Sequence, residues 1–278
     1  MNHLCISAPA KLNLFLHITG QREDGYHELQ SVFQLIGLYD ELEFVLSETP
    51  DITLACQQAE LAGPDNLIIR AAKALQAHTA CHQGANISLQ KNIPTGAGLG
   101  GGSSDAASTL IALNELWQLG LSREDLANIG LKLGADVPVF VHGRNAWAEG
   151  IGEKLSPMSL PAQWFLVINP GCHVSTKEIF SHQELTRNST AIKMAAFLAR
   201  QTRNDCENIV RKLYPEVDQA LVWLSKRATA RMTGTGASVF APFATEAEAT
   251  AVLAQLPKKW KGFVAQGLDN SPLPKNAC

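Results

Sequence analysis

The sequence predicts an α+β protein of two domains, on three observations. Short segments of alternating polar and apolar residues, typical of strands, stand beside segments with helical spacing. Residues 164–266 follow the order strand, helix, helix, strand, helix, strand, which indicates a split βαβ sandwich. Residues 156–163 are rich in proline and serine, so we expect domains of residues 1–158 and 159–278.

The composition is that of an ordinary globular protein, with 46% hydrophobic and 18% charged residues and a net charge of −3. There is no basic run of the kind that binds nucleic acid, so we expect no nucleic-acid partner. We see no signal-peptide pattern and no apolar run of membrane-spanning length. We therefore expect a cytoplasmic protein without membrane contact, acting as a monomer or weak homodimer.

The cysteines and histidines give no metal signature. The six cysteines are widely spaced without a C-x-x-C pair, which favours reduced thiols over a disulfide framework. The eight histidines form no H-E-x-x-H or mixed cysteine and histidine cluster. We expect no metal held by a dedicated set of protein ligands.

The most informative segment is a glycine-rich loop, defined here as Pro94-Thr-Gly-Ala-Gly-Leu-Gly-Gly-Gly-Ser-Ser104. Residues 85–91 alternate like a strand before it, and residues 106–117 have helical spacing after it, with Ser103, Ser104 or Asp105 available as N-cap. Its five glycines are too many for an ordinary turn, because each costs backbone entropy on folding. A strand, a glycine loop and a helix N-terminus together predict a phosphate-binding site.

The loop does not fit three common phosphate-binding classes. It matches G-x-G-x-x-G literally. A dinucleotide-binding fold, however, has this motif directly after its first strand and an acidic residue at the end of the next strand, and the loop meets neither condition. No lysine precedes Ser103, which excludes a Walker A loop. The V-A-I-K, H-R-D and D-F-G segments of protein kinases are missing.

Three other segments carry polar residues of interest. Alternation over residues 10–18 places Lys11 and Asn13 on one strand face, where a solvated edge is the simpler interpretation. Tyr26 and His27 follow an Asp-Gly turn and could stack on and hydrogen-bond a planar ring. Asp136 lies between a helix and the apolar run 137–141, which we predict to be a strand; it suits either a turn or the mouth of a site.

Several element boundaries are predicted by capping patterns. Asp65 and Asn66 precede a helix, Ser122 with Asp125 caps another, and Asn204 with Glu207 has capping-box spacing. Residues 146–154 are predicted to form a hairpin or a bulged strand. Residues 231–241 form a second glycine turn that leads into an apolar strand.

Five segments together resemble the GHMP family of small-molecule kinases. The glycine-rich loop resembles the family's phosphate loop, and Arg231-Met-Thr-Gly-Thr-Gly-Ala237 resembles its C-terminal glycine motif. Three further segments are similar to the branch that phosphorylates a cytidine diphosphate ester of methylerythritol: Pro9-Ala-Lys-Leu-Asn-Leu14, Arg22-Glu-Asp-Gly-Tyr-His27 and Gly134-Ala-Asp-Val-Pro-Val139. The resemblance extends from residue 7 to about residue 273.

The resemblance implies a fold and a reaction. The fold would be a ribosomal-protein-like nucleotide domain with a left-handed βαβ crossover, followed by a ferredoxin-like domain. The cofactor would be ATP with Mg²⁺. The substrate would be the cytidine ester, phosphorylated at its 2-hydroxyl in non-mevalonate isoprenoid biosynthesis. Asp136 would accept the hydroxyl proton and Lys11 would pair with Asp136.

The resemblance also implies the binding residues. The ATP phosphates would lie on Pro94, Thr95, Gly96, Ala97, Gly98, Leu99, Gly100, Gly101, Gly102, Ser103 and Ser104, with Asp65, Asn66 and Lys91 on the adenine side. The cytidine ester would contact Asn13, Tyr26, His27, Thr176, Phe180 and Gly234. Two alternatives stay open: a kinase of the same family for mevalonate or homoserine, and a non-catalytic nucleotide-binding regulator.

Overall fold

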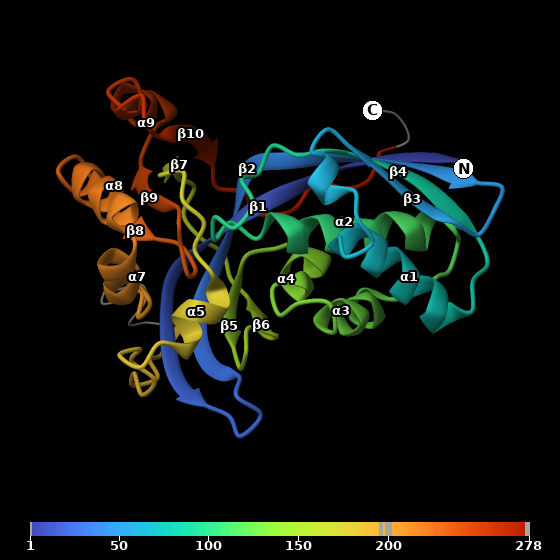
Figure 1. The fold of residues 1–278 in the computed structure, drawn as a ribbon, viewed down its shortest axis with the longest axis horizontal. Helices are drawn as coiled ribbons and strands as arrows, with labels where there is room; N and C mark the ends of the chain where they lie inside the picture. The colour runs from blue at the N-terminus through green and yellow to red at the C-terminus, as the bar shows by residue number, and fades with distance from the viewer. Residues whose placement is uncertain (1, 195–196, 198–201, 276–278) are drawn as a thin grey trace.

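Two β-sheets divide the computed structural model, which describes residues 2–194, 197 and 202–275 (Figure 1). The larger sheet has six strands in the order β3-β4-β2-β5-β6, with β1 paired to β2. Its strands are β1 (His3–Gln21), β2 (His27–Ser47), β3 (Ile52–Cys56), β4 (Gly84–Gln90), β5 (Ala146–Glu149) and β6 (Lys154–Pro157). A short 3₁₀ turn, η1 (Ala59–Leu61), precedes the helices on one side of this sheet: α1 (Leu67–Thr79), α2 (Gly101–Leu116), α3 (Arg123–Leu131) and α4 (Val137–His142).

The smaller sheet has four strands in the order β10-β7-β9-β8, and all its pairings are antiparallel. This order is that of the ferredoxin-like fold, as predicted, although the sequence pattern missed the two-residue strand β8. The strands are β7 (Trp164–Asn169), β8 (Arg231–Met232), β9 (Val239–Phe243) and β10 (Lys261–Gln266). The helices of this part are α5 (Thr176–Ser181), α7 (Glu207–Leu213), α8 (Pro215–Ser225) and α9 (Glu246–Leu253).

The long antiparallel pair β1–β2 extends from the larger sheet into the smaller lobe (Figure 1). Register shifts between Pro9 and Ala10 and between Asn13 and Leu16 bend β1 along the way. The polar face of this strand is buried: Lys11 and Asn13 are each 3% exposed. The interpretation of Lys11 as part of a solvated edge is therefore wrong.

The described residues form four apolar clusters, and the three largest of them hold the molecule together. One lies between the larger sheet and its helices, and a second fills the smaller lobe. The third joins the two parts, because it combines residues of the long strands, the glycine-rich loop and the smaller sheet: Ala10, Leu12, Ile36, Ile93, Ala97, Leu99, Phe165, Val167, Phe240 and Ala265. The division at residues 158 and 159 stays a prediction, as does the handedness of the crossover.

The structure corrects two local predictions of secondary structure. The run 137–141 is helix α4, not a strand, because Pro138 suits a helix's first turn and Gly143 ends it with a φ of +65°. Helix α2 already begins at Gly101, with Gly100 as its N-cap, so Ser103, Ser104 and Asp105 lie inside the helix.

Capping and cysteine chemistry gave mixed outcomes. The capping box at Ser122 and Asp125 is confirmed, whereas the one at Asn204 is wrong because Cys206 is the N-cap of α7. Among the described cysteines, Cys5 is disulfide-bonded, contrary to the expectation of reduced thiols. The other described cysteines are free: Cys56, Cys81, Cys172 and Cys206.

Candidate active site

A cleft of about 860 Å³ lies where the glycine-rich loop, the start of β2 and helix α5 meet. Most of the predicted site residues line it. They include Lys11, Asn13, Tyr26, His27, Lys91, the loop from Pro94 to Ser103, Asp136, Thr176, Phe180 and Gly234. Residues that the pattern placed on separate segments thus share one cavity.

The glycine-rich loop is shaped by backbone that only glycine adopts readily. Gly96, Gly98 and Gly100 have φ angles of +62°, +74° and +73°. A methyl group on Gly98 would collide with the Thr233 carbonyl oxygen and lie 2.8 Å from that of Gly236. The loop delivers the chain to the N-terminus of α2, whose first amides have no acceptor within the helix. This geometry suits an anionic group.

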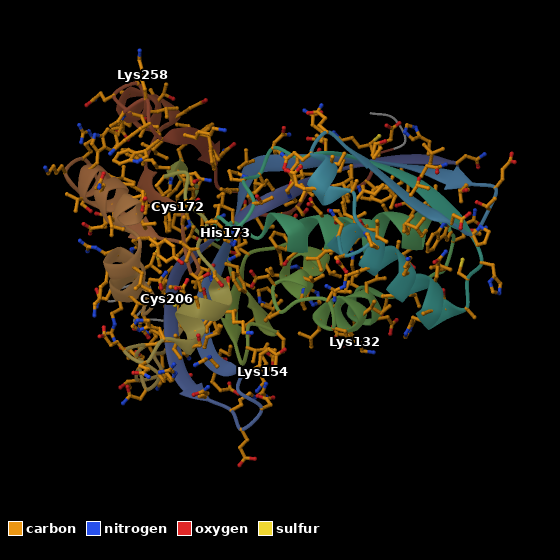
Figure 2. The ribbon with its side chains drawn as sticks, in the orientation of Figure 1. Lys132, Lys154, Cys172, His173, Cys206 and Lys258 are labelled. Carbon is orange, nitrogen blue, oxygen red and sulfur yellow. The ribbon has the colours of Figure 1, made fainter. Side chains whose placement is uncertain are left out.

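The second glycine turn supports the loop from the smaller lobe. The Thr233 hydroxyl donates to the Gly98 carbonyl at 3.2 Å, and the Ser238 amide donates to the Ala97 carbonyl at 3.1 Å. The side chain of His173 packs against Gly96, and Figure 2 shows His173 at the junction of the two lobes. Both lobes therefore determine the shape of the glycine-rich loop.

Lys11 and Asp136 form an ion pair in the cleft, with 3.3 Å between Nζ and Oδ2. The Lys11 side chain is 4% exposed and that of Asp136 is 35% exposed, so the carboxylate is open to the cavity. The Lys11 ammonium also donates to the Asn13 side chain and, at 3.3 Å, to the Gly98 carbonyl. Lys11 thus connects the carboxylate of Asp136 to the glycine-rich loop.

Asn13 and Thr176 are held by further hydrogen bonds. The side-chain nitrogen of Asn13 donates to the Ser31 hydroxyl at 2.8 Å. This bond fixes the side-chain oxygen of Asn13 toward Lys11. The hydroxyl groups of Thr176 and Thr235 lie 3.0 Å apart, so α5 contacts the second glycine turn. Gly234, which belongs to the second glycine turn, lies beside the side chain of Asn13.

The ring of His27 stacks on that of Phe180, with centroids 5.1 Å apart and planes 25° from parallel. Tyr26 is 58% exposed at the rim of the same cleft. Burial, and then the charge of Arg187, lower the pKa of His27, which favours the neutral form of its ring. Arg187 donates to His27 Nε2 at 3.0 Å. No motif of the sequence indicated Arg187, because it lies in a polar segment without periodicity.

Of the residues predicted for the adenine side, Lys91 is the one that lines the cleft within the described part of the chain. Asp65 and Asn66 are not among the described residues that line the cleft; the Asn66 side chain instead accepts from the Ile68 amide and caps α1. Lys91 lines the cleft, but its ammonium donates to the carboxylates of Asp40 and Asp105. Lys91 therefore has a structural role whether or not it contacts a nucleotide.

The cluster of Asp40, Lys91 and Asp105 lies beneath the glycine-rich loop and carries two carboxylates for one ammonium. Burial raises the pKa of Asp105 to about 7, against the opposing effect of Lys91, and Asp40 adds to the increase. One carboxylate oxygen of Asp105 has no hydrogen-bond partner among the described residues. Asp40 accepts from the amides of Asn92 and Ile93, which fixes the chain that leads into the loop.

A site for Mg²⁺ fits this cleft only with the nucleotide as its main ligand. Within the described part of the chain, no group of three or more histidine, cysteine, aspartate or glutamate residues could hold a metal ion. Ser103 lines the cleft, and the buried hydroxyl of Ser104 lacks a described partner. Mg²⁺ keeps waters and phosphate oxygens as ligands with few protein groups, and these hydroxyls agree with such a site.

Comparison with known proteins identifies the class. The models of the GHMP kinases N terminal domain and GHMP kinases C terminal match residues 66–144 and 183–262. The chain belongs to the GHMP kinase family and is a small-molecule kinase that uses ATP. Solved structures of other members share the fold alone: the mevalonate kinase of Methanococcus jannaschii is 17% identical with a TM-score of 0.73, over 96% of this chain and 98% of that one.

Within the family, high identity is found to 4-diphosphocytidyl-2-C-methyl-D-erythritol kinases. That of Alkalilimnicola ehrlichii is 55% identical over 96% of this chain and 91% of the relative. That of Marinobacter nauticus is 52% identical over 99% of this chain and 98% of the relative. A crystal structure of 4-(cytidine 5'-diphospho)-2C-methyl-D-erythritol kinase is 32% identical, covers 95% of this chain and 98% of that one, and has a TM-score of 0.79.

One further finding concerns membranes. None of the helices in the described residues is long and apolar enough to cross a bilayer.

Proposed function

We propose that this kinase transfers the γ-phosphoryl group of ATP to the 2-hydroxyl of 4-(cytidine 5'-diphospho)-2-C-methyl-D-erythritol. The observation that carries the proposal is the position of the Lys11–Asp136 pair in the cleft that also contains the glycine-rich loop and the His27–Phe180 stack. Phosphoryl transfer requires little more than positioning and charge stabilisation, and these groups supply both.

The glycine-rich loop holds the nucleotide phosphates. The amides at the N-terminus of α2, with the positive end of the helix dipole, bind the phosphate oxygens, and the hydroxyl of Ser103 or Ser104 would help to hold Mg²⁺. Bound Mg²⁺ would neutralise charge on the phosphate oxygens. Lys91 remains a candidate for the adenine side; Asp65 and Asn66 are less suited because Asn66 is used as a helix cap.

Asp136 and Lys11 act on the attacking hydroxyl. The hydroxyl oxygen forms a bond to the γ-phosphorus while the bond from that phosphorus to ADP breaks, and the hydroxyl proton passes to the Asp136 carboxylate. Lys11, held by Asn13 and the Gly98 carbonyl, orients Asp136 and offsets the charge of the transferring group.

The cytidine ester occupies the part of the cleft near β2 and α5. Tyr26 and Phe180 enclose the cytosine, and His27 hydrogen-bonds its edge. Asn13, Thr176 and Gly234 contact the erythritol and diphosphate. The enzyme acts in the cytoplasm as a monomer or weak homodimer, with its active site between the two domains.

One assay tests the proposal against its alternatives. The purified protein is given ATP and Mg²⁺ with the cytidine ester, mevalonate or homoserine, and ADP formation is followed. We expect turnover with the cytidine ester alone. Turnover with mevalonate or homoserine instead would show that the protein is a kinase for another alcohol. Nucleotide binding without turnover of any of the three would indicate a non-catalytic regulator.

A further inference from the structure

Arg187 donates a hydrogen bond to Nε2 of His27, whose side chain lines the cleft. We propose that Arg187 is a positioning residue that fixes His27 in the tautomer with hydrogen on Nδ1 and so selects cytosine over uracil. The inference rests on the proposed function for its substrate class. The structural observation behind it is a different one from that behind the proposed function: Nε of Arg187 donates to Nε2 of His27 at 3.0 Å.

The guanidinium is anchored independently of His27. Its Nη2 donates to the carbonyl groups of Phe180 at 3.0 Å and His182 at 2.8 Å, and its Nη1 donates to that of Leu185 at 3.3 Å. Three carbonyl acceptors therefore set the direction in which Nε–H points. Because arginine carries donors only, the Nε2 atom of His27 must be the acceptor.

A histidine that accepts through Nε2 carries its single proton on Nδ1. Protonation of both nitrogens is opposed, since His27 is 9% exposed and lies against a permanent positive charge. The other charged groups on the cleft near this end are Asp24 and Lys177, and neither is recorded in contact with the ring. The ring therefore offers one remaining polar group, an Nδ1–H donor.

The same guanidinium aligns the stacking partner. Arg187 binds the backbone carbonyl of Phe180, whose ring lies on that of His27. One side chain thus fixes the donor direction and the aromatic surface together. Loss of Arg187 should loosen both, whereas it should leave the glycine-rich loop unaffected, because the hydrogen bonds of Arg187 within the described residues go to His27, Phe180, His182 and Leu185 and not to that loop.

A fixed donor distinguishes the two pyrimidines. Ring nitrogen N3 of cytosine is an acceptor, whereas in uracil the same position carries hydrogen. An Nδ1–H group therefore pairs with cytosine and meets a second donor in uracil. A binding site that hydrogen-bonds its substrate rejects the mismatched analogue strongly, since the buried donor is then unpaired.

The first experiment measures the tautomer directly, by ¹⁵N NMR of the full-length protein with labelled histidine. His27 is assigned by its loss in His27→Asn. We expect Nδ1 protonated and Nε2 bare in the wild type, and a shift toward the Nε2–H form in Arg187→Met. A wild-type spectrum with Nε2 protonated would overturn the inference.

The second experiment measures base selection by calorimetry with CMP and UMP, which does not depend on turnover. We expect wild type to prefer CMP and Arg187→Met to lose roughly 10-fold or more of that preference, with the affinity for ADP unchanged. Arg187→Lys keeps the charge but not the planar anchor, so it should restore little of the preference. Arg211→Met, which removes an arginine on α7 paired to Asp218, serves as the matched control.

The outcomes separate this inference from the proposed function. Unchanged CMP preference in Arg187→Met, or no binding of either nucleotide to wild type, would refute the role of Arg187. Failure of the cytidine ester as a phosphoryl acceptor, with the NMR and calorimetric results as expected, would refute only the proposed reaction. Circular dichroism and Tm verify that each variant is folded.

Discussion

Lys11 contacts three different acceptors in the cleft, and only one of them is a carboxylate. Asn13 and the Gly98 carbonyl hold the ammonium in place, so its direction does not depend on Asp136. The carboxylate of Asp136 is the partly exposed member of the pair and is therefore the group that a substrate hydroxyl can reach. This asymmetry supports the proposal that Asp136 accepts the proton and that Lys11 stabilises charge.

Replacing either member should affect the chemical step. We expect Asp136→Asn and Lys11→Ala each to lower kcat by roughly 10²-fold or more, because a proton acceptor or a transition-state charge is lost. Nucleotide affinity should barely change. Steady-state kinetics with ADP titration measure both quantities, and wild-type turnover in either variant would contradict the assignment.

His27 should act on one substrate only. We expect His27→Ala to raise KM for the cytidine ester by about 10-fold or more, through loss of a base contact, and to leave KM for ATP unchanged. The two KM values are measured in the same assay with one substrate saturating. An equal increase in both would indicate a folding defect, which the Tm of the variant would show.

Some residues of the site could be predicted and others could not, for a physical reason. Alternation along one strand was enough to place Lys11 beside Asn13, because side chains of a strand have period two. The pairing with Asp136 needed the family resemblance, since contacts between distant segments leave no local pattern. Arg187 was missed because its role depends on three backbone carbonyls, and any sequence can supply those.

At the scale of elements, the glycine-rich loop combines an unusual backbone with close packing. We expect Gly98→Ala to raise KM for ATP at least 10-fold and to destabilise the protein by about 1–3 kcal/mol, because its φ is +74° and Thr233 blocks a methyl group. Gly120→Ala is the control: its φ is +69° but nothing lies within 4 Å of the added carbon. Similar KM values in both variants would exclude a steric role for Thr233.

The buried cluster under the loop should make stability depend on pH. Asp105 has a pKa of about 7 in the folded protein, against 3.8 when unfolded, so between these values the folded state holds a proton that the unfolded state releases. The contribution of Asp105 to stability is therefore full below pH 3.8, falls as pH rises, and is lost above pH 7.

Asp105→Asn should remove this dependence. We expect the wild type to lose about 1–3 kcal/mol of unfolding free energy relative to the variant between pH 5 and pH 8. Urea unfolding at both pH values measures the difference. Parallel changes in the two proteins would contradict a titrating Asp105.

Helix α4 shows where element prediction failed. Its run Val-Pro-Val-Phe-Val is apolar at every position and buried from Val137 to Val141. Periodicity cannot distinguish a short helix from a strand when all faces are buried. The available signal was the proline near the helix start followed by Gly143, and these flanking residues carried more information than the apolar run.

At the scale of the whole molecule, the order of the smaller sheet was predictable from the sequence of elements, but its union with the larger one was not. The joining cluster draws residues from six segments, including Leu12 on β1, Leu99 in the loop and Phe165 on β7. Such contacts are set by tertiary packing, which composition and periodicity do not record. Because Leu99 belongs to this cluster, the packing between the lobes also supports the glycine-rich loop.

Weakening the joining cluster should therefore affect stability and nucleotide binding together. Phe165 and Phe240 pack edge to face at 6.0 Å and both are buried. We expect Phe165→Ala to cost about 3–5 kcal/mol of unfolding free energy and to raise KM for ATP several-fold, since the loop loses part of its support.

Calorimetry should show one cooperative transition in wild type, because the cluster couples the two lobes. Val222→Ala, a truncation at a 40% exposed position of α8, should change neither quantity by much. Two separate transitions in wild type, or a Phe165→Ala enzyme that is destabilised yet keeps its KM for ATP, would show that the lobes fold and bind independently.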